Sequence, residues 1–131
     1  MKKSFLFIFL LMAAIGLHAQ GTTAKSAKNI EKMVRFTNAD YNMGRIHAGK
    51  PLEYTVKVTN ISRDTFAIQH VMPGCGCTTP KYKSGEKLLP GKSVTVVLGF
   101  NGNAHGKFTK SADIIFSNGM VKQVRFRGEA G

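Results

Sequence analysis

The stretch Leu52-Glu-Tyr-Thr-Val-Lys-Val-Thr-Asn60 decides the fold class of this chain. Its apolar residues recur at every second position from Leu52 to Val58, and the residues between them are polar. A period of two places the two sets on opposite faces of an extended strand, so one face is buried and the other meets solvent. We therefore expect a strand of an antiparallel sheet that covers one side of a core.

Four later segments repeat this alternation of apolar and polar residues. We expect them to form further strands with one buried face, because a period of two is typical of half-buried strands. The side chains that this period turns toward the core are Phe66, Ile68, Val94, Val96, Leu98, Phe100, Ala112, Ile114, Phe116, Val124 and Phe126.

Turn-forming residues separate these segments. Residues 60–64, 89–92 and 117–119 each close one segment and open the next, and the last of them contains a hairpin-forming Asn-Gly pair. An earlier pair of strands is expected at residues 33–37 and 41–46. About seven short strands at this spacing predict an all-β fold, an immunoglobulin-like antiparallel β-sandwich, and a single antiparallel barrel is the alternative.

Composition supports one modest domain without an obvious catalytic centre. The chain has 131 residues, of which 43% are apolar, and 19 Lys and Arg against seven Asp and Glu give a formal net charge of +12. The acids are scattered along the chain, and neither a Gly-x-Ser-x-Gly nucleophile elbow nor a glycine-rich phosphate loop before a helix occurs. We expect no enzymatic activity, with weak thiol–disulfide exchange as the one chemistry left open.

The first residues have the pattern of an export signal. Lys2 and Lys3 precede an apolar run at residues 5–17, and Leu17-His18-Ala19 matches a cleavage site before Gln20. Thirteen apolar residues are too few to span a bilayer, which needs about twenty. We predict that residues 1–19 are a signal peptide, that the protein is periplasmic or extracellular, and that no transmembrane segment remains after cleavage.

The rest of the chain divides into a leader and a domain. Residues 20–32 are small, polar and basic, with Ile30 as their one large apolar residue, and this composition predicts a flexible leader. Residues 33–131 hold all the expected strands and form the domain. Within it, Asn60-Ile-Ser62 matches the pattern of a glycosylation acceptor, which we interpret as a chance match.

Several motifs, taken in their order and spacing, carry a family resemblance. They are Asn42-Met-Gly44-Arg-Ile46 with Gly49, Val56-x-Val58-x-Asn60, Gly74-Cys-Gly-Cys-Thr78, Leu89-Pro-Gly91, and Phe108-Thr-Lys110 before Ser117-Asn118. Over residues 40–128 they resemble the bacterial secreted family called domain of unknown function 1573, with Cys-Gly-Cys-Thr as the most specific element. That family is also similar to the immunoglobulin-like interaction modules of the ASH/Hydin group. The resemblance implies a fold and an exported location, and no catalytic residues.

Cys75 and Cys77 are the residues with distinctive chemistry. They flank Gly76 in a sharp loop at the end of a strand, where glycine eases the small ring that a disulfide between them would close. Three interpretations stay open: a structural disulfide, a reducible pair that exchanges with other thiols, or two thiolate ligands for Cu(I). In the last case Met72 and His70 would complete the ligand set. His70 has the strand parity of Ile68, so an ordinary strand histidine is the simpler interpretation.

The basic residues indicate a second candidate surface. Lys81, Lys83, Lys87 and Lys92 crowd the segment after the cysteines, and such a cluster attracts anionic lipids, acidic glycans or acidic proteins. A solvated basic face is the simpler alternative. Nucleic acid is not an expected partner, because the chain is exported and has no row of aromatic residues for base stacking.

These observations predict a non-catalytic exported binding or scaffolding module with the Cys-Gly-Cys loop as its functional end. The expected partner is another envelope or secreted protein, or an anionic envelope surface. The alternative is a small thiol–disulfide or Cu(I)-handling protein of the cell envelope. No other cofactor is expected.

Overall fold

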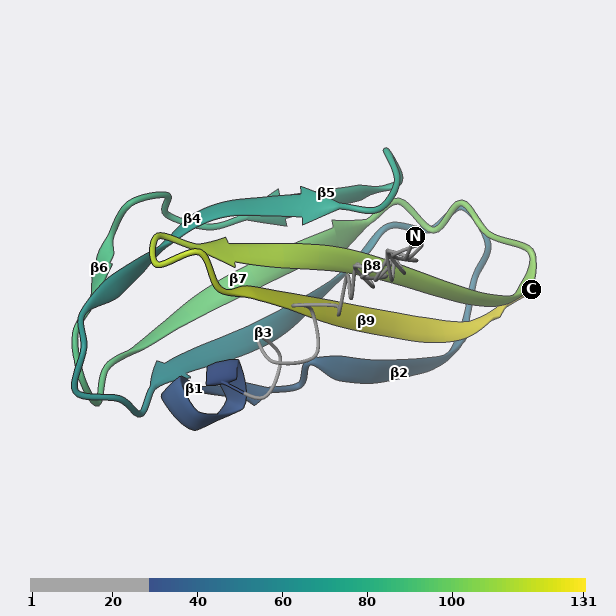
Figure 1. Ribbon diagram of the computed structural model, residues 1–131. Coiled ribbons are helices and arrows are strands. Elements are labelled where there is room, and N and C mark those ends of the chain that lie inside the picture. The colour runs from purple at the N-terminus through teal and green to yellow at the C-terminus, as the bar shows by residue number, and fades with distance from the viewer. Residues whose placement is uncertain (1–28) are drawn as a thin grey trace, which may run out of the picture.

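The computed structural model describes residues 29–131, which form two β-sheets packed face to face (Figure 1). The four-stranded sheet has the order β1 (Val34–Thr37), β3 (Leu52–Asn60), β7 (Ser93–Phe100) and β5 (Thr78–Lys81). The five-stranded sheet has the order β2 (Asp40–Ile46), β9 (Val121–Ala130), β8 (Gly106–Phe116), β4 (Phe66–Pro73) and β6 (Lys87–Leu88). The predicted all-β sandwich is confirmed, and the short strands β5 and β6 account for the two strands beyond the expected seven.

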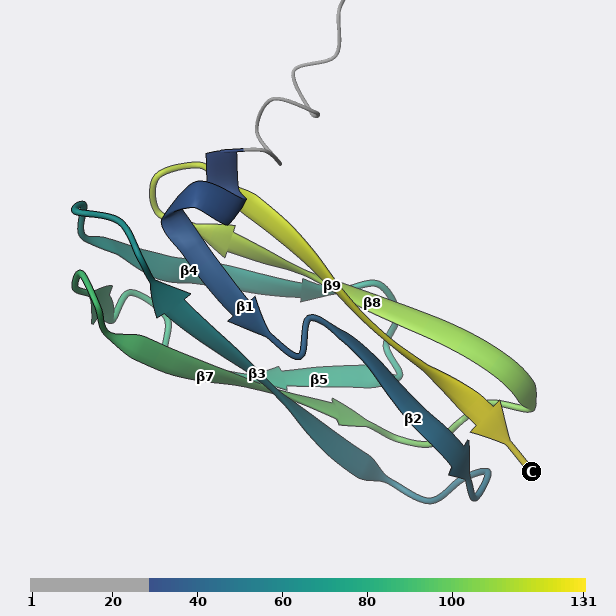
Figure 2. The same cartoon turned by 90° about the horizontal axis from the view of Figure 1, so that it is seen from below.

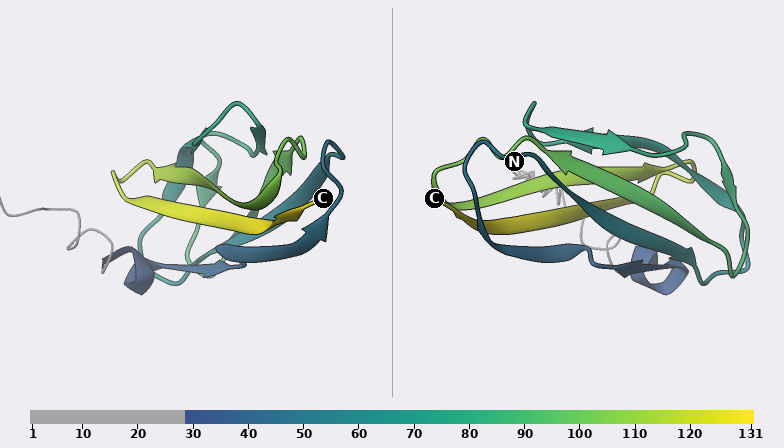
Figure 3. Two further views of the ribbon diagram at one scale, coloured as in Figure 1. Left: turned by 90° about the vertical axis from the view of Figure 1, so that its right-hand side faces the viewer. Right: turned by 180° about the vertical axis from the view of Figure 1, so that it is seen from behind.

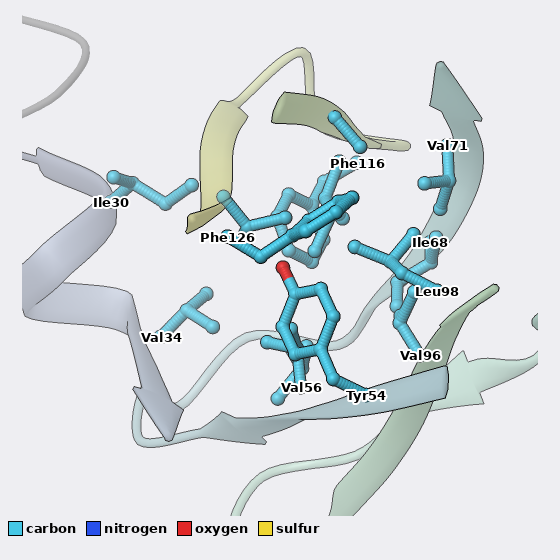
Figure 4. Close-up of a cluster of buried hydrophobic side chains, with 14 of the residues drawn as sticks. Ile30, Val34, Tyr54, Val56, Ile68, Val71, Val96, Leu98, Phe116 and Phe126 are labelled. Atoms are coloured by element: carbon cyan, nitrogen blue, oxygen red, sulfur yellow. The ribbon is translucent and has the colours of Figure 1, made fainter. Parts of the chain in front are cut away.

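The core lies between the two sheets, as the alternation in the sequence predicts. Seen from behind, β3 and β7 cross in front of β8 and β9 (Figure 3). Side chains from both layers meet there, and Val56, Val96 and Phe126 are fully buried (Figure 4). Every side chain predicted to face the core is buried except Leu52 and Val94, which are half-buried. The buried face of each of these strands was therefore predicted correctly, except in β4 beyond Ile68.

Tyr54 brings a polar group into this core. Its ring stacks on Tyr41 at 5.4 Å and lies 5.1 Å from the ring of Phe126, between centroids. Among the described residues, its hydroxyl is the buried side-chain polar group without a hydrogen-bond partner. Burial, together with the negative charge of Asp40, raises the pKa of the Tyr54 hydroxyl above its ordinary value. The hydroxyl therefore stays neutral and unpaired.

Replacing Tyr54 with phenylalanine is expected to raise the free energy of unfolding by about 1 kcal/mol, because a buried, unpaired hydroxyl costs about 1–3 kcal/mol. Urea denaturation of the two proteins measures the difference. Tyr41→Phe is the matched control, since the Tyr41 side chain is exposed and its hydroxyl can reach water. A Tyr54→Phe variant less stable than the parent would mean that the hydroxyl has a partner, such as a buried water.

Both early strands form close to the expected residues, but they lie in different sheets and do not pair with each other. β1 pairs with β3, whereas β2 crosses to the other sheet and pairs with β9 in parallel. The crossing occurs at Asn38, which has a positive φ of 73° and donates a hydrogen bond from Nδ2 to the carbonyl oxygen of Thr55 at 3.0 Å. One parallel pair thus interrupts an otherwise antiparallel fold.

The predicted leader is also corrected at its C-terminal end. Residues 29–33 form a short helical segment, and the side chain of Ile30 is buried against the core. Ile30 therefore belongs to the packed domain, although it lies within the range predicted for the leader. The predicted signal peptide and the leader up to residue 28 lie outside the described residues. Within residues 29–131, no helix is long and apolar enough to cross a membrane.

The sandwich has two distinct ends, which we call the cysteine end and the helical end. The cysteine end carries the loops at residues 47–51, 74–77 and 101–105, together with the C-terminus. The helical end carries the segment 29–33 and the turn at residues 117–120. Figure 2 shows the helical segment and the C-terminus at opposite extremes of the molecule, with the connection after β4 lying toward the C-terminal side.

Asn60 fixes the helical end from within. Its side chain is fully buried, its Nδ2 donates to the carbonyl oxygens of Asp64 at 2.6 Å and Leu88 at 2.9 Å, and its Oδ1 accepts from the backbone and hydroxyl of Ser62. An amide with all its hydrogen bonds used inside the protein is not accessible for glycosylation. The interpretation of Asn60-Ile-Ser62 as a chance match agrees with this burial.

Candidate functional site

The Cys-Gly-Cys loop is the crossing between the two sheets at the cysteine end. β4 belongs to the five-stranded sheet and β5 to the four-stranded sheet, so residues 74–77 must pass from one layer to the other. The backbone N–H of Gly74 donates to the carbonyl oxygen of Ser111 at 2.9 Å, and that of Asn101 donates to the carbonyl oxygen of Cys77 at 3.0 Å. Each sheet therefore holds one side of the loop.

The two sulfur atoms are joined in a disulfide. The Cα atoms of Cys75 and Cys77 are 5.3 Å apart, and both residues are half-buried, with exposed Gly76 between them. A Cβ atom built on Gly76 would meet nothing within 4 Å, so the tip of the loop opens to solvent. The two cysteines are therefore bonded to each other in a half-buried loop with an exposed tip.

Thr78 is part of this site, although no role was predicted for it from the sequence. Its side chain is buried, and its hydroxyl lies 3.9 Å from Sγ of Cys75 and 3.8 Å from Sγ of Cys77. A hydroxyl can donate to either sulfur, and such a donor stabilises a thiolate. The sequence contained an indication of such a role, because Thr78 is the last residue of the Cys-Gly-Cys-Thr motif. The direction of the Thr78 side chain could not be predicted, because it depends on Thr78 being the first residue of β5.

The structure does not bring His70 and the cysteines together. A bulge after Ile68 shifts the register of β4 against β8, so that His70 and Met72 face solvent while Val71 is buried. The parity expected for His70 is therefore wrong. His70 Nδ1 lies 3.2 Å from the hydroxyl of Tyr82. Among residues 29–131, no three His, Cys, Asp or Glu side chains gather in a way that could hold a metal ion.

The four lysines of the predicted anionic-partner surface are all exposed, but they do not form one face. Lys81 lies on β5 of the four-stranded sheet, where it pairs with Glu53 at 2.5 Å, whereas Lys87 lies on β6 of the other sheet. Lys83 is 4.0 Å from Glu86, and Lys92 lies in the turn before β7. Two of the four charges are thus partly balanced by neighbouring carboxylates.

The disulfide is expected to contribute little to stability. A Cys75→Ser, Cys77→Ser double variant should fold and lose about 1–2 kcal/mol, because a ring closed over so few residues removes little entropy from the unfolded chain. Chemical denaturation measures the loss, and a single Lys57→Ala variant at an exposed position of β3 reports the effect of an ordinary surface change. A double variant that fails to fold would identify the loop as a core element instead.

Comparisons with known proteins place the chain by family and by fold. The family model described as "Protein of unknown function (DUF1573)" matches residues 34–130. No curated protein matches the sequence. Among solved structures, an ASH/PapD-like domain of human CEP192 aligns with a TM-score of 0.57 at 11% identity, over 76% of this chain and 86% of that one.

Two bacterial structures show the same fold. A protein of unknown function from Porphyromonas gingivalis W83 aligns with a TM-score of 0.60 at 12% identity, over 74% of this chain and 46% of that one. The Vibrio cholerae VesB protease aligns with a TM-score of 0.62 at 11% identity. The alignment covers 82% of this chain but only 34% of VesB. At such identities the likeness extends to the fold alone, which is of the PapD-like immunoglobulin type.

Proposed function

Since the chain belongs to the DUF1573 family of proteins of unknown function, we propose that it is a non-catalytic, exported binding or scaffolding module whose Cys75–Cys77 loop is the binding end. The observation that carries this proposal is the way the loop is presented. It is tied to both sheets by backbone hydrogen bonds, its tip at Gly76 is open, and it lies away from the helical end that residues 29–33 form.

A rigid, exposed tip favours binding because little conformational entropy is lost when a partner docks on it. The disulfide and the backbone bonds of Gly74 and Cys77 fix the loop before any partner arrives. A leader attached at the opposite end would leave the tip accessible to another envelope or secreted protein. The family resemblance to interaction modules agrees with this role.

Site-specific photo-crosslinking in intact cells tests the proposal. A photoreactive amino acid at Gly76 should give a discrete crosslinked species, and the Cys75→Ser, Cys77→Ser background should weaken it. The matched control places the same amino acid at Asn118, an exposed turn position at the helical end. Crosslinks at Asn118 but none at Gly76 would contradict the assignment of the binding end.

Thiol–disulfide exchange is a second candidate, which the Thr78 contact favours. An incoming thiolate would attack one sulfur of the pair, form a mixed disulfide and release the other cysteine as a thiolate. A second thiol of the reductant would then break the mixed disulfide, so that the dithiol leaves oxidised and both cysteines are reduced. The Thr78 hydroxyl, which is within 3.9 Å of both sulfurs, would donate a hydrogen bond to the departing thiolate.

Reduction by dithiothreitol measures this role of Thr78. A Thr78→Val variant should react several-fold more slowly than the parent, and Thr78→Ser, which keeps the hydroxyl, should react at nearly the parental rate. Equal rates for all three proteins would remove Thr78 from the mechanism. Mass spectrometry of the reduced protein after addition of Cu(I) tests the copper alternative, in which the thiolates of Cys75 and Cys77 would be the ligands.

A further inference from the structure

A groove on the outer face of the five-stranded sheet lies apart from the cysteine loop. It has a volume of about 480 Å³ and is formed where β2, β9 and β8 run side by side (Figure 1). The loop at residues 74–77 belongs instead to the crossing from β4 to β5. A ligand in the groove would therefore be bound by different strands from a partner at the loop.

The strand register sets polar side chains in rows across the groove. In one row, Arg45 of β2 and Lys107 of β8 flank Glu129 of β9. In the next row, Asn42 and Thr109 flank Arg127. All these side chains are exposed and line the groove. Guanidinium, ammonium, amide and hydroxyl groups thus converge from three strands on one hollow.

Two glycines make the hollow possible. β2 bulges between Asn42 and Arg45, and Gly44 within the bulge has a positive φ of 69°. A Cβ atom on Gly128 would lie 2.7 Å from the carbonyl oxygen of Gly44 and 3.0 Å from the ring of Phe108. Only glycine at position 128 therefore lets the bulge approach β9 so closely. The shape of the groove is therefore set by the backbone, through the bulge in β2 and its close contact with β9.

The charge of the groove favours an anionic ligand. Three cations, Arg45, Lys107 and Arg127, line it against the single carboxylate of Glu129. Arg127 is paired with Asp40, which does not line the groove, and the ion pairs among residues 29–131 include neither Arg45 nor Lys107. Residues 1–28 contain no Asp or Glu that could neutralise these two cations.

The shape of the groove narrows the class of anion. A flat lipid bilayer cannot follow a hollow. An extended peptide would have to satisfy its own backbone N–H and C=O groups, usually by pairing with a free strand edge. β9, which forms the floor of the groove, lies between β2 and β8 and is paired on both sides, so the floor offers no such edge. The free edge of this sheet is the far side of β2, away from β9. A saccharide has no backbone amides, and its hydroxyl and carboxylate groups match side-chain donors.

We propose that this groove binds an acidic saccharide, in which the carboxylates of uronic acid units contact Arg45, Lys107 and Arg127 while sugar hydroxyls contact Asn42 and Thr109. Glu129 accepts hydrogen bonds from hydroxyls and limits the affinity for the carboxylates. This surface replaces the cluster Lys81, Lys83, Lys87 and Lys92 as the site for an anionic partner.

Trigalacturonate is the probe, and its trimethyl ester is the neutral control of the same size. In a titration of the ¹⁵N-labelled protein at low ionic strength, trigalacturonate should shift amide signals of β2, β8 and β9 and leave the cysteine loop unchanged. The trimethyl ester should bind at least about tenfold more weakly, because it lacks the charges that strengthen the hydrogen bonds. Monomeric galacturonate separates recognition of one unit from recognition of a chain.

Two double variants that lose the same charge distinguish the effect of the groove residues on binding from the effect of the net charge of the protein. Arg45→Gln, Lys107→Gln should weaken trigalacturonate binding at least about tenfold, since two charge-assisted hydrogen bonds are lost. Lys81→Gln, Lys83→Gln should change it less than about twofold, because exposed charges outside the site act only through screened long-range attraction. Glu129→Gln should strengthen binding, which keeps the test valid even if the first double variant is unstable.

Four results would overturn the proposal. They are shifts confined to other strands, equal binding of the trimethyl ester, equal losses in the two double variants, and saturation by acetate at the same carboxylate concentration. Tighter binding of a poly-glutamate peptide than of trigalacturonate would also overturn it in favour of an acidic polypeptide. The Cys75→Ser, Cys77→Ser variant should bind trigalacturonate as the parent does, so failure of the loop proposal and failure of this one are distinguishable.

Discussion

Replacing Phe126 with alanine is expected to remove about 3–5 kcal/mol from the free energy of unfolding, the usual cost of truncating a buried aromatic side chain. Phe126 is completely buried, and its ring lies 5.1 Å from that of Tyr54 and 5.3 Å from that of Phe100. It thus joins the two sheets at the centre of the core (Figure 4). A loss of this size is a large part of the stability of a domain of about 100 residues.

The neighbouring residue supplies the control. Arg125 points to the outer face of the same strand and is exposed, so Arg125→Ala should change stability by less than about 0.5 kcal/mol. Equilibrium unfolding in urea, followed by tyrosine fluorescence or circular dichroism, gives both values. Similar losses in the two variants would mean that β9 is placed with the wrong face toward the core, because a shift of one residue exchanges the faces.

Replacing Asn60 with alanine is expected to cost about 3–4 kcal/mol. The side chain makes four hydrogen bonds, two of them to the backbone carbonyls of Asp64 and Leu88, and alanine would leave these groups unpaired. Each buried group without a partner costs about 1–3 kcal/mol. Thermal and urea unfolding of the Asn60→Ala protein measure the loss, and the helical end should exchange its amide hydrogens faster than the cysteine end.

Ser62→Ala is the matched control for Asn60. It removes one hydroxyl that bonds to the same Oδ1 atom, so its expected cost is about 0.5–1.5 kcal/mol, as for an ordinary hydrogen bond. If Asn60→Ala cost no more than Ser62→Ala, the network around the Asn60 amide would not be what fixes the helical end.

The strands could be predicted where the residues of one short segment show which side chains face the core and which face solvent. In β3, the apolar residues from Leu52 to Val58 were predicted to face the core and the polar residues between them to face solvent. The structure confirms this alternation. In β4, the same rule failed beyond Ile68, because a bulge adds one residue and reverses the faces of His70 and Met72. A bulge is set by the pairing with β8 and leaves no trace in the period of β4 itself.

The position of the cysteine loop could be predicted from its own residues, since Gly74 and Gly76 mark a turn at a strand end. Features that depend on pairing between strands far apart in the sequence could not be predicted. The groove could not be predicted, because Arg45, Lys107 and Arg127 come together only through the pairing of β2 and β8 with β9. Nothing near residue 45 indicates a parallel partner near residue 129. The lysines after the cysteines were close in sequence, yet the fold separates them between two sheets.

The parallel pairing of β2 with β9 also determines when the domain can become complete. Among the strands of residues 29–131, β2 is the second and β9 the ninth, so β2 has no strand partner in its sheet until β9 has been synthesised. Until then its backbone groups form an open strand edge, the kind of surface that chaperones and other chains bind. Pairing across such a sequence distance is entropically slow. Pairing of β9 with β2 is therefore a late step of folding, and it leaves only the far side of β2 as an edge of the five-stranded sheet.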